Sequence, residues 1–312
     1  MAHSSLFEEF LAAVNAPLRF TRDEMDELPG VGALHLLEGE ERVEAEDILI
    51  ARLPRNDGRV ANALADVGCV RAIPALIEAT GEAASPTMRV FSARALLRLR
   101  NLSGRAALVS MLRNPTDSAD ERAGAARLLA EFPDPDKELL LEVASTDPDS
   151  GVRSSAVTAV LTVWGLNGET TMWGEVLLSI GGRLLSSLPS VRQEALTELR
   201  GILARIDAGE TAEDLGLTWH ADRKTEPLYS FVESLEGDEP DFPIAGLRDL
   251  TGRDRTLVEN LVLLRLDKDR RAVRAAGALG VHRAIEPLRE LLDKTEGHAH
   301  TEIEAVLENL TH

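Results

Sequence analysis

The chain has 312 residues, with 34 Lys and Arg against 53 Asp and Glu, which gives a formal net charge of -19 at pH 7. A surface with this balance repels phosphate backbones, so the charge argues against nucleic acid as a partner and favours a basic protein. Solubility alone also explains the charge, and both interpretations stay open.

Length and composition favour a stack of helices. A single core of this length would be near the upper limit for one domain, so two domains or an elongated stack are expected. Aromatic residues make up only 4% of the chain. The apolar residues are mainly Ala, Leu and Val, which suit closely packed helices better than strands.

The sequence predicts a cytoplasmic protein. The first ten residues lack the basic region and long apolar run of a signal peptide. No uncharged apolar stretch of ~18 residues is available to span a bilayer. Cys69 is the only cysteine, so an intramolecular disulfide is excluded and a small apolar filler is expected there.

Residues 1–42 are expected to form an N-terminal helical cap. Their first part predicts an amphipathic helix with an apolar face of Leu6, Phe7, Phe10, Leu11 and Val14. Acidic residues and a Pro-Gly turn follow. A unit that covers the end of a stack with a polar outer face explains this pattern.

Residues 43–206 are expected to form a repeat array. The segment 43–80 predicts a helix with an apolar face of Val43, Ile48, Leu49 and Leu53. After a turn, Gly68 is placed to end a second helix, and Pro74 falls in the first turn of the next, where its missing N–H costs little. Trp164 ends a later helix at a spacing that suits burial in the core.

Residues 207–254 are expected to form an irregular acidic interruption without a sustained helical period. They contain Trp219, Tyr229 and Phe231, followed by the acidic residues Glu236, Asp238, Glu239 and Asp241. A loop of this length inside an ordered array is more often functional or disordered than a simple connection.

Residues 255–312 are expected to form C-terminal repeats and a cap. The stretch Arg283-Ala-Ile-Glu-Pro-Leu closely repeats Arg71-Ala-Ile-Pro-Ala-Leu, and each follows a short Ala- and Leu-rich run that ends in Gly280 or Gly68. Units of two helices cannot bury their apolar faces alone and must stack on their neighbours.

This pattern resembles the short bacterial HEAT repeat of the phycobilisome-lyase type over residues 43–168, 187–206 and 255–295. The resemblance implies an all-α fold, an α-solenoid (superhelix) of stacked antiparallel HEAT-like helix pairs. In such families a recurring arginine commonly bonds an Asp or a backbone carbonyl of an adjacent turn. The arginines expected in this structural role are Arg59, Arg89, Arg122, Arg153, Arg192 and Arg274.

Catalytic templates are absent from the sequence. It has no Walker-type Gly-rich loop, no Gly-x-Ser-x-Gly elbow and no His-Glu-x-x-His pair. His298 and His300 have no third ligand at a typical metal-site spacing. We therefore expect no catalytic residue, no metal and no cofactor.

The expected function is non-catalytic: the protein is a protein-binding scaffold or adaptor. A more specific form of this hypothesis is that it inhibits a basic toxin or nuclease. The expected partner contacts are Trp173, Trp219, Tyr229, Phe231, Glu236, Asp238, Glu239 and Asp241, because exposed aromatics anchor interfaces and acidic clusters steer basic partners. The alternative is an enzyme, since the resemblance also includes a bilin lyase or chromophore chaperone and a divergent DNA glycosylase.

Overall fold

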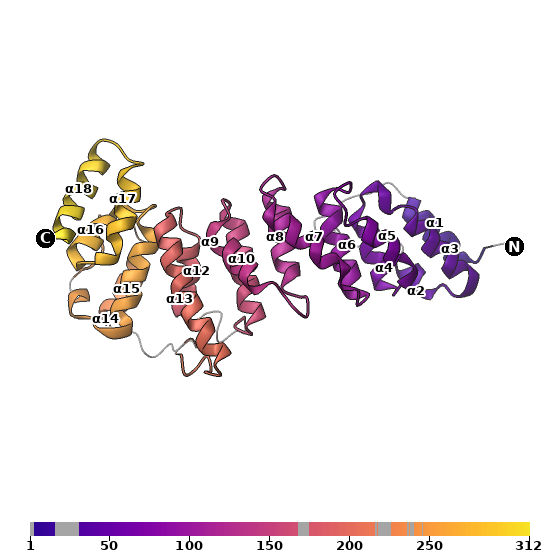
Figure 1. Cartoon of the computed structure of the whole chain (residues 1–312), viewed down its shortest axis with the longest axis horizontal. Coiled ribbons are helices and arrows are strands. Elements are labelled where there is room, and N and C mark those ends of the chain that lie inside the picture. The colour runs from indigo at the N-terminus through magenta and orange to yellow at the C-terminus, as the bar shows by residue number, and fades with distance from the viewer. Residues whose placement is uncertain are drawn as a thin grey trace. The chain divides into compact units, whose positions relative to one another are not determined.

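The computed structural model describes residues 3–15, 31–167, 175–215, 217, 226–235, 237, 240–244 and 246–312, without the side chains of 175, 176, 178, 226, 229 and 253. The described residues form helices and turns and include no strand. They divide into two compact units, Met1–Asp136 and Lys137–His312. Within each unit, antiparallel helices stack on their neighbours (Figure 1), as predicted for an α-solenoid of HEAT-like pairs.

The helices of the first unit that the structure describes run from α1 to α8. They are α1 (Ser5–Asn15), α2 (Val31–Leu36), α3 (Gly39–Ile50), α4 (Gly58–Asp66), α5 (Ile73–Glu78), α6 (Pro86–Arg98), α7 (Arg105–Arg113) and α8 (Ala119–Leu129). The main packing contacts join α4 with α6, α7 with α8, and α1 with α2.

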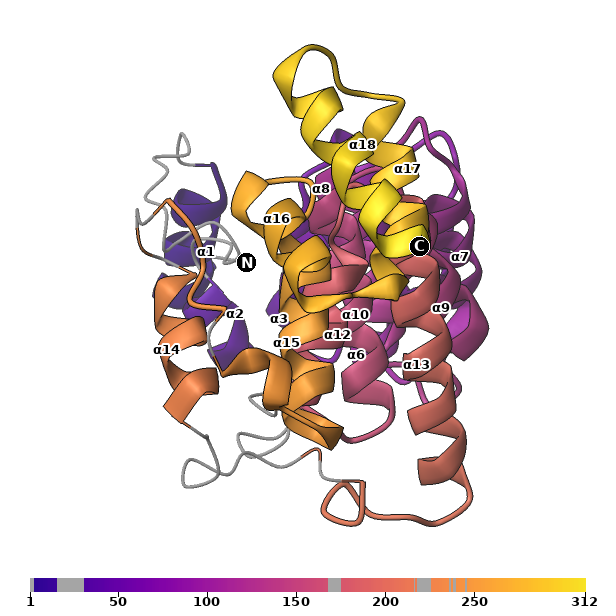
Figure 2. The ribbon, with the colours of Figure 1, turned by 90° about the vertical axis from the view of Figure 1, so that its left-hand side faces the viewer.

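The described helices of the second unit run from α9 to α18. They are α9 (Lys137–Thr146), α10 (Ser150–Val163), α12 (Glu175–Leu184), α13 (Pro189–Asp207), α14 (Glu226–Ser234), α15 (Gly252–Arg265), α16 (Arg270–Leu279), α17 (Ile285–Leu292) and α18 (His298–Thr311). Helix α18 packs on both α16 and α17 (Figure 2), and α12 packs on both α13 and α15.

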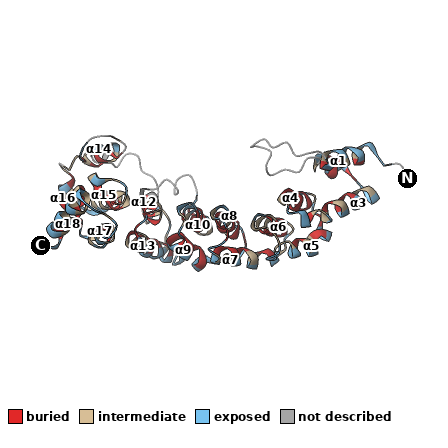
Figure 3. Ribbon diagram, turned by 90° about the horizontal axis from the view of Figure 1, so that it is seen from above, coloured by how far each residue is buried: buried red, intermediate tan, exposed pale blue. Residues whose placement is uncertain are grey.

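Each unit has its own core between the helices, where the buried residues lie (Figure 3). In the first unit, Phe7 and Phe10 of α1 are fully buried against α2, α3 and α4. This burial confirms the amphipathic helix predicted near the N-terminus. In the second unit, the core joins Phe231 of α14 to residues of α15, α16 and α17. None of the helices that the structure describes is long and apolar enough to cross a membrane.

Local signals set the helix ends. Gly68 has a φ of +68° just after α4, and the N–H of Cys69 bonds back to the carbonyl of Leu64 at 2.9 Å. Glycine reaches this left-handed conformation without strain, so the predicted stop is confirmed. Pro74 lies in the first turn of α5, also as predicted.

The recurring arginines serve the fold. On α6, Arg89 forms a buried ion pair of 2.8 Å with Asp117, which lies just before α8. On α10, Arg153 donates to the carbonyls of Asp147 and Leu184 at 2.7 and 2.9 Å. On α13, Arg192 donates to the carbonyl of Ser145 at 2.7 Å. The predicted structural role is therefore confirmed for these residues.

The six arginines do not occupy one repeated position. Arg89, Arg122 and Arg153 each lie four residues after the N-cap residue of their helix, whereas Arg59 lies two residues after Asp57. The counterpart of Arg59 in the last repeats is Arg271, not Arg274. Arg59 and Arg274 therefore bind carboxylates from other positions of their helices, Arg59 that of Asp57 and Arg274 those of Asp241 and Glu302.

A duplicated pair of caps shows this correspondence. The side chain of Asp57 accepts the backbone N–H of Arg59 and binds its guanidinium at 2.7 Å, and Asp269 makes the same contacts with Arg271, at 2.8 Å to the guanidinium. Burial raises the pKa of both carboxyls, but the hydrogen bonds and charge of the neighbouring arginine outweigh it and hold each pKa below its ordinary value.

The duplication extends back to α3 and α15. Arg42 and Arg255 each bind a glutamate one turn later, Glu46 at 2.8 Å and Glu259 at 2.7 Å. Each of these arginines also donates to the carbonyl of Val67 or Leu279 at the end of the next helix. Both helices begin at a glycine with positive φ. The repeat seen in the sequence is therefore part of a longer duplicated module.

The described parts of the interruption expected over residues 207–254 include helical segments that were not predicted. Helix α13 continues to Asp207, α14 covers residues 226–234, and a 3-10 turn covers Leu247–Asp249. The spacing of Leu228, Phe231 and Leu235, all buried, is a helical period that the sequence analysis missed.

We predict that Asp117→Ala lowers the free energy of unfolding by about 3 kcal/mol, because the substitution leaves the buried guanidinium of Arg89 without its counter-charge. The matched control is Asp66→Ala, which removes the more exposed pair with Arg98 and should cost less than about 1 kcal/mol. Urea unfolding followed by circular dichroism measures both. Equal losses would show that the buried pair has no special role.

We also predict a pH effect of the duplicated caps. Because the folded pKa of Asp57 and Asp269 is depressed, their stabilisation is present above the ordinary carboxyl pKa and is lost as pH falls through the folded pKa. Asp57→Asn with Asp269→Asn keeps a capping oxygen but cannot titrate. Thermal melts between neutral and strongly acidic pH should therefore show a flatter acid limb for the variant. An unchanged acid limb would contradict the assignment.

Candidate functional site

The predicted partner contacts are only partly visible. Trp173, Trp219, Glu236, Asp238 and Glu239 lie outside the described residues. Tyr229 belongs to α14, but its side chain is not described. Phe231 and Asp241 are therefore the two predicted contacts whose side chains can be placed.

Phe231 is a core residue, so its expected role as an exposed contact was wrong. Its side chain is fully buried and meets the ring of Phe242 edge-on, with ring centroids 5.3 Å apart. The guanidinium of Arg271 covers the other ring at 4.5 Å and donates to the carbonyl of Gly237 at 2.8 Å. These contacts fix α14 against α16.

Asp241 is exposed but bound to a neighbouring arginine. Arg274 holds the carboxylates of Asp241 and Glu302 at 2.5 and 2.9 Å. The side chain of Asp241 is nevertheless 64% exposed. This part of the predicted acidic cluster thus stays accessible to a partner, with its charge partly balanced.

Trp164 is not the core residue that its spacing suggested. The indole is only partly buried, and its Nε1 donates to Asp207 at 3.2 Å. Lys137 lies over the ring at 4.2 Å and 3.7 Å from the carboxylate of Asp207. The tryptophan therefore joins α9, α10 and α13 at the surface through a cation–π contact and a hydrogen bond.

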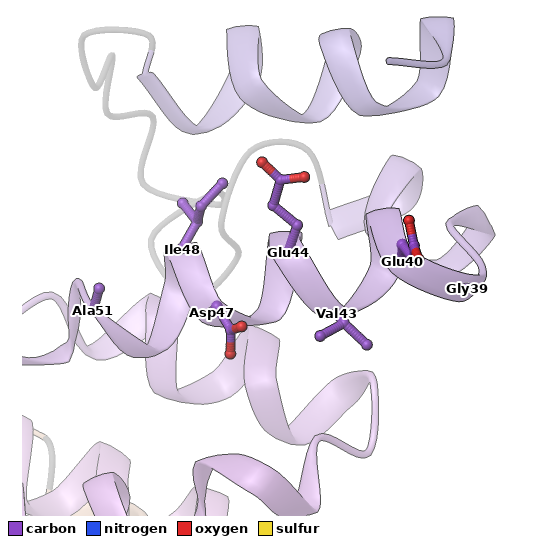
Figure 4. A pocket seen from close by; sticks show the side chains of 7 residues that line it. All are labelled: Gly39, Glu40, Val43, Glu44, Asp47, Ile48 and Ala51. Carbon is purple, nitrogen blue, oxygen red and sulfur yellow. The ribbon is translucent and has the colours of Figure 1, made fainter. Parts of the chain in front are cut away.

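A hollow that sequence analysis did not single out lies along one side of α3. Its volume is about 750 Å³. We call this side the α3 face, defined by Gly39, Glu40, Val43, Glu44, Asp47, Ile48 and Ala51 (Figure 4). In this view onto the face, Glu44 and Ile48 point upward along one edge, and Val43 and Asp47 point downward along the other.

The α3 face combines apolar and acidic side chains. Val43 is 45% exposed, although the sequence pattern placed it on the same apolar face as the buried Leu49. The side chains of Glu44 and Asp47 are 53% and 55% exposed. The possible signal in the sequence was the alternation of these acids with Val43 and Ile48, which gives α3 no single apolar side.

Two basic groups border this face. His3 lies 4.0 Å from Glu44 and 3.9 Å from Glu41. Arg71 binds Asp47 at 2.5 Å and lies 3.6 Å from the buried Glu46. Glu40, Glu41, Glu44 and Asp47 outnumber these two groups, so the local charge is negative.

The described residues offer little for covalent or metal chemistry. They contain no group of three or more His, Cys, Asp or Glu side chains that could hold a metal ion. Burial, with a smaller contribution from Glu46, raises the pKa of the Cys69 thiol to about 11. At 3% exposure, Cys69 fills space in the core as predicted.

Comparison with known proteins identifies one repeat directly. The sequence model of the PBS lyase HEAT-like repeat family matches residues 58–81. These residues comprise α4, the following 3-10 turn and α5. No curated protein and no solved structure matches the chain. The chain therefore contains a HEAT-like repeat at residues 58–81, and the described helices stack as in a HEAT-like α-solenoid.

Proposed function

We propose that the protein is a non-catalytic scaffold that binds a protein partner through acidic parts of its surface. The observation that carries this proposal is the excess of acidic residues, which burial does not offset. Among the described residues, five arginines but only three acidic residues are buried. Burial therefore removes slightly more positive than negative charge from the surface of the described residues and does not offset the net charge of -19.

The chemistry of such a surface favours a basic partner. An excess of exposed carboxylates speeds the encounter with a positively charged protein and rejects acidic ones. Repeat stacks also present wide surfaces on which many side chains can contribute. We propose inhibition of a basic toxin or nuclease as the sharper version, since its surface must attract phosphate chains and would equally attract carboxylates.

The alternative is a bilin lyase or chromophore chaperone, and the support for it is the name of the matched repeat family. It requires a pocket that combines a histidine, a carboxylate and tryptophans. The hollow of the α3 face is lined by neither a histidine nor a tryptophan, and Trp173 and Trp219 lie outside the described residues. This alternative therefore rests on resemblance, whereas the scaffold rests on the charge distribution.

We predict that the tagged full chain captures a stoichiometric basic protein from its native extract at low salt and releases it at moderate salt, because exposed charge pairs are screened. Mass spectrometry identifies the partner. Capture of no protein, together with a coloured or nucleotide-like molecule that co-purifies, would contradict the scaffold and favour the enzyme.

We further predict that neutral replacements of the expected acidic cluster slow association with that partner. The variant carries Glu236→Gln, Asp238→Asn, Glu239→Gln and Asp241→Asn, and its salt dependence should be flatter. A matched control neutralises four exposed acids of the first unit, Glu78, Glu82, Asp120 and Glu131. Stopped-flow or biosensor kinetics would rule out this cluster as the interface if both variants behave alike.

A further inference from the structure

The duplicated module places the α3 face in correspondence with a face of α15 that is already covered by a helix. Gly39 and Gly252 begin the two helices, and the Arg42–Glu46 and Arg255–Glu259 pairs fix the same register. In that register Glu44, Asp47 and Ala51 correspond to Leu257, Asn260 and Leu264.

Helix α12 packs on the corresponding face of α15. Leu264 lies so close to Gly182 that a β-carbon on this glycine would come within 3.0 Å of the leucine Cδ2. After α12, the N–H of Ser187 donates to the carboxylate of Asp267 at 2.9 Å. This face of α15 thus receives a helix that offers a small residue at the point of closest approach.

The residues of α15 on this face are buried, as expected under a covering helix, whereas the corresponding residues of α3 are exposed. Leu257 and Asn260 are 8% and 3% exposed, whereas the side chains of Glu44 and Asp47 are more than half exposed. On the α3 face, His3 and Arg71 contact Glu44 and Asp47, and Ile48 packs partly against the core. No described helix buries Glu44, Asp47 or Val43, and the hollow of about 750 Å³ lies there.

We propose that the α3 face is a docking site for a basic amphipathic helix of a protein partner. The duplicated module supplies the helical geometry. The partner's charge follows from the substitutions between the two copies: the neutral Leu257 and Asn260 are replaced by the acidic Glu44 and Asp47. A helix with lysines or arginines beside a stripe of small apolar residues complements both the carboxylates and Val43, Ile48 and Ala51.

A second copy of this chain does not fit the same site. Each copy carries a net charge of -19, so two copies repel each other, and this repulsion is strongest at low salt. A solvent-exposed end cap explains the acids alone, whereas the docking site rests on the acids together with the hollow and the partly exposed Val43 beside them. The docking site rests on the proposed scaffold function and adds to the expected acidic cluster a second contact surface, with the kind of helix that it binds.

The test uses the full chain and two synthetic helical peptides, one with an Ala and Leu stripe flanked by Lys, the other with Glu in place of every Lys. Fluorescence anisotropy should show that the Lys peptide binds at low salt and that the Glu peptide does not. Glu40→Lys with Glu44→Lys should weaken the Lys peptide by about tenfold or more. No binding of the Lys peptide to the unmodified chain would overturn the proposal.

The chain offers a matched control on α18. Glu304 and Glu308 are exposed and have the same spacing as Glu40 and Glu44. Each pair also has one glutamate near a histidine: Glu304 lies 3.5 Å from His300, and Glu44 lies 4.0 Å from His3. Glu304→Lys with Glu308→Lys should change the affinity by less than about twofold. Equal weakening by both variants would show a general charge effect and overturn the site.

A photo-crosslinking residue in place of Ala51 identifies the occupant. A crosslink to the Lys peptide supports the docking site. In the free protein, a crosslink to residues 16–30 of the same chain, or to a second copy, would show that this segment or copy occupies the face. Either result would overturn the proposal.

The failure of this site and the failure of the scaffold function can be told apart. If the partner captured from the extract binds equally well to the Glu40→Lys, Glu44→Lys variant, the docking site is wrong and the scaffold function stands. If no protein partner is captured, the scaffold function itself fails.

Discussion

The stacks depend on guanidinium groups that satisfy the polar groups of the turns. Short connections leave carbonyls and carboxylates at the helix ends, and these must find donors when neighbouring helices exclude water. Arg89 and Arg153 reach from one helix to the next turn and supply these donors. Their long stems also pack against the helices that they join, so each arginine serves both the core and the turn. The acidic surface itself comes from the composition, 34 basic against 53 acidic residues, and the burial of these arginines adds slightly to it.

Much of the fold could be predicted because its signals are local. Gly68 and Pro74 act through their own backbone, and Phe7 and Phe10 show a helical period within one short segment. The side chains of Phe231 and Trp164 were placed wrongly for the opposite reason. Phe231 is buried because Phe242 and Arg271 arrive from elsewhere in the chain, and Trp164 is held at the surface by Lys137 and Asp207. A pattern in one segment carries no information about such distant neighbours.

The α3 face could not be predicted from the sequence, because the exposure of a side chain such as Val43 depends on which other helices pack against it. Val43 and Leu49 looked equivalent in the sequence, yet they lie on different sides of the helix, and only Leu49 meets the core. The comparison of the two copies of the module supplies the missing information, since α15 shows what the same side looks like when it is covered. The Asp57 and Asp269 caps and the Arg42 and Arg255 pairs make that comparison possible, because they fix the register residue by residue.

The division into two units also has a spectroscopic consequence. All three tryptophans and the single tyrosine belong to the second unit, Lys137–His312. Near-ultraviolet absorbance and intrinsic fluorescence therefore report on that unit, and Trp164 senses the contact among α9, α10 and α13. The first unit, including α3, absorbs almost nothing at these wavelengths. A single tryptophan introduced there would make it visible separately, and a fragment of that unit would escape detection on an ordinary absorbance trace.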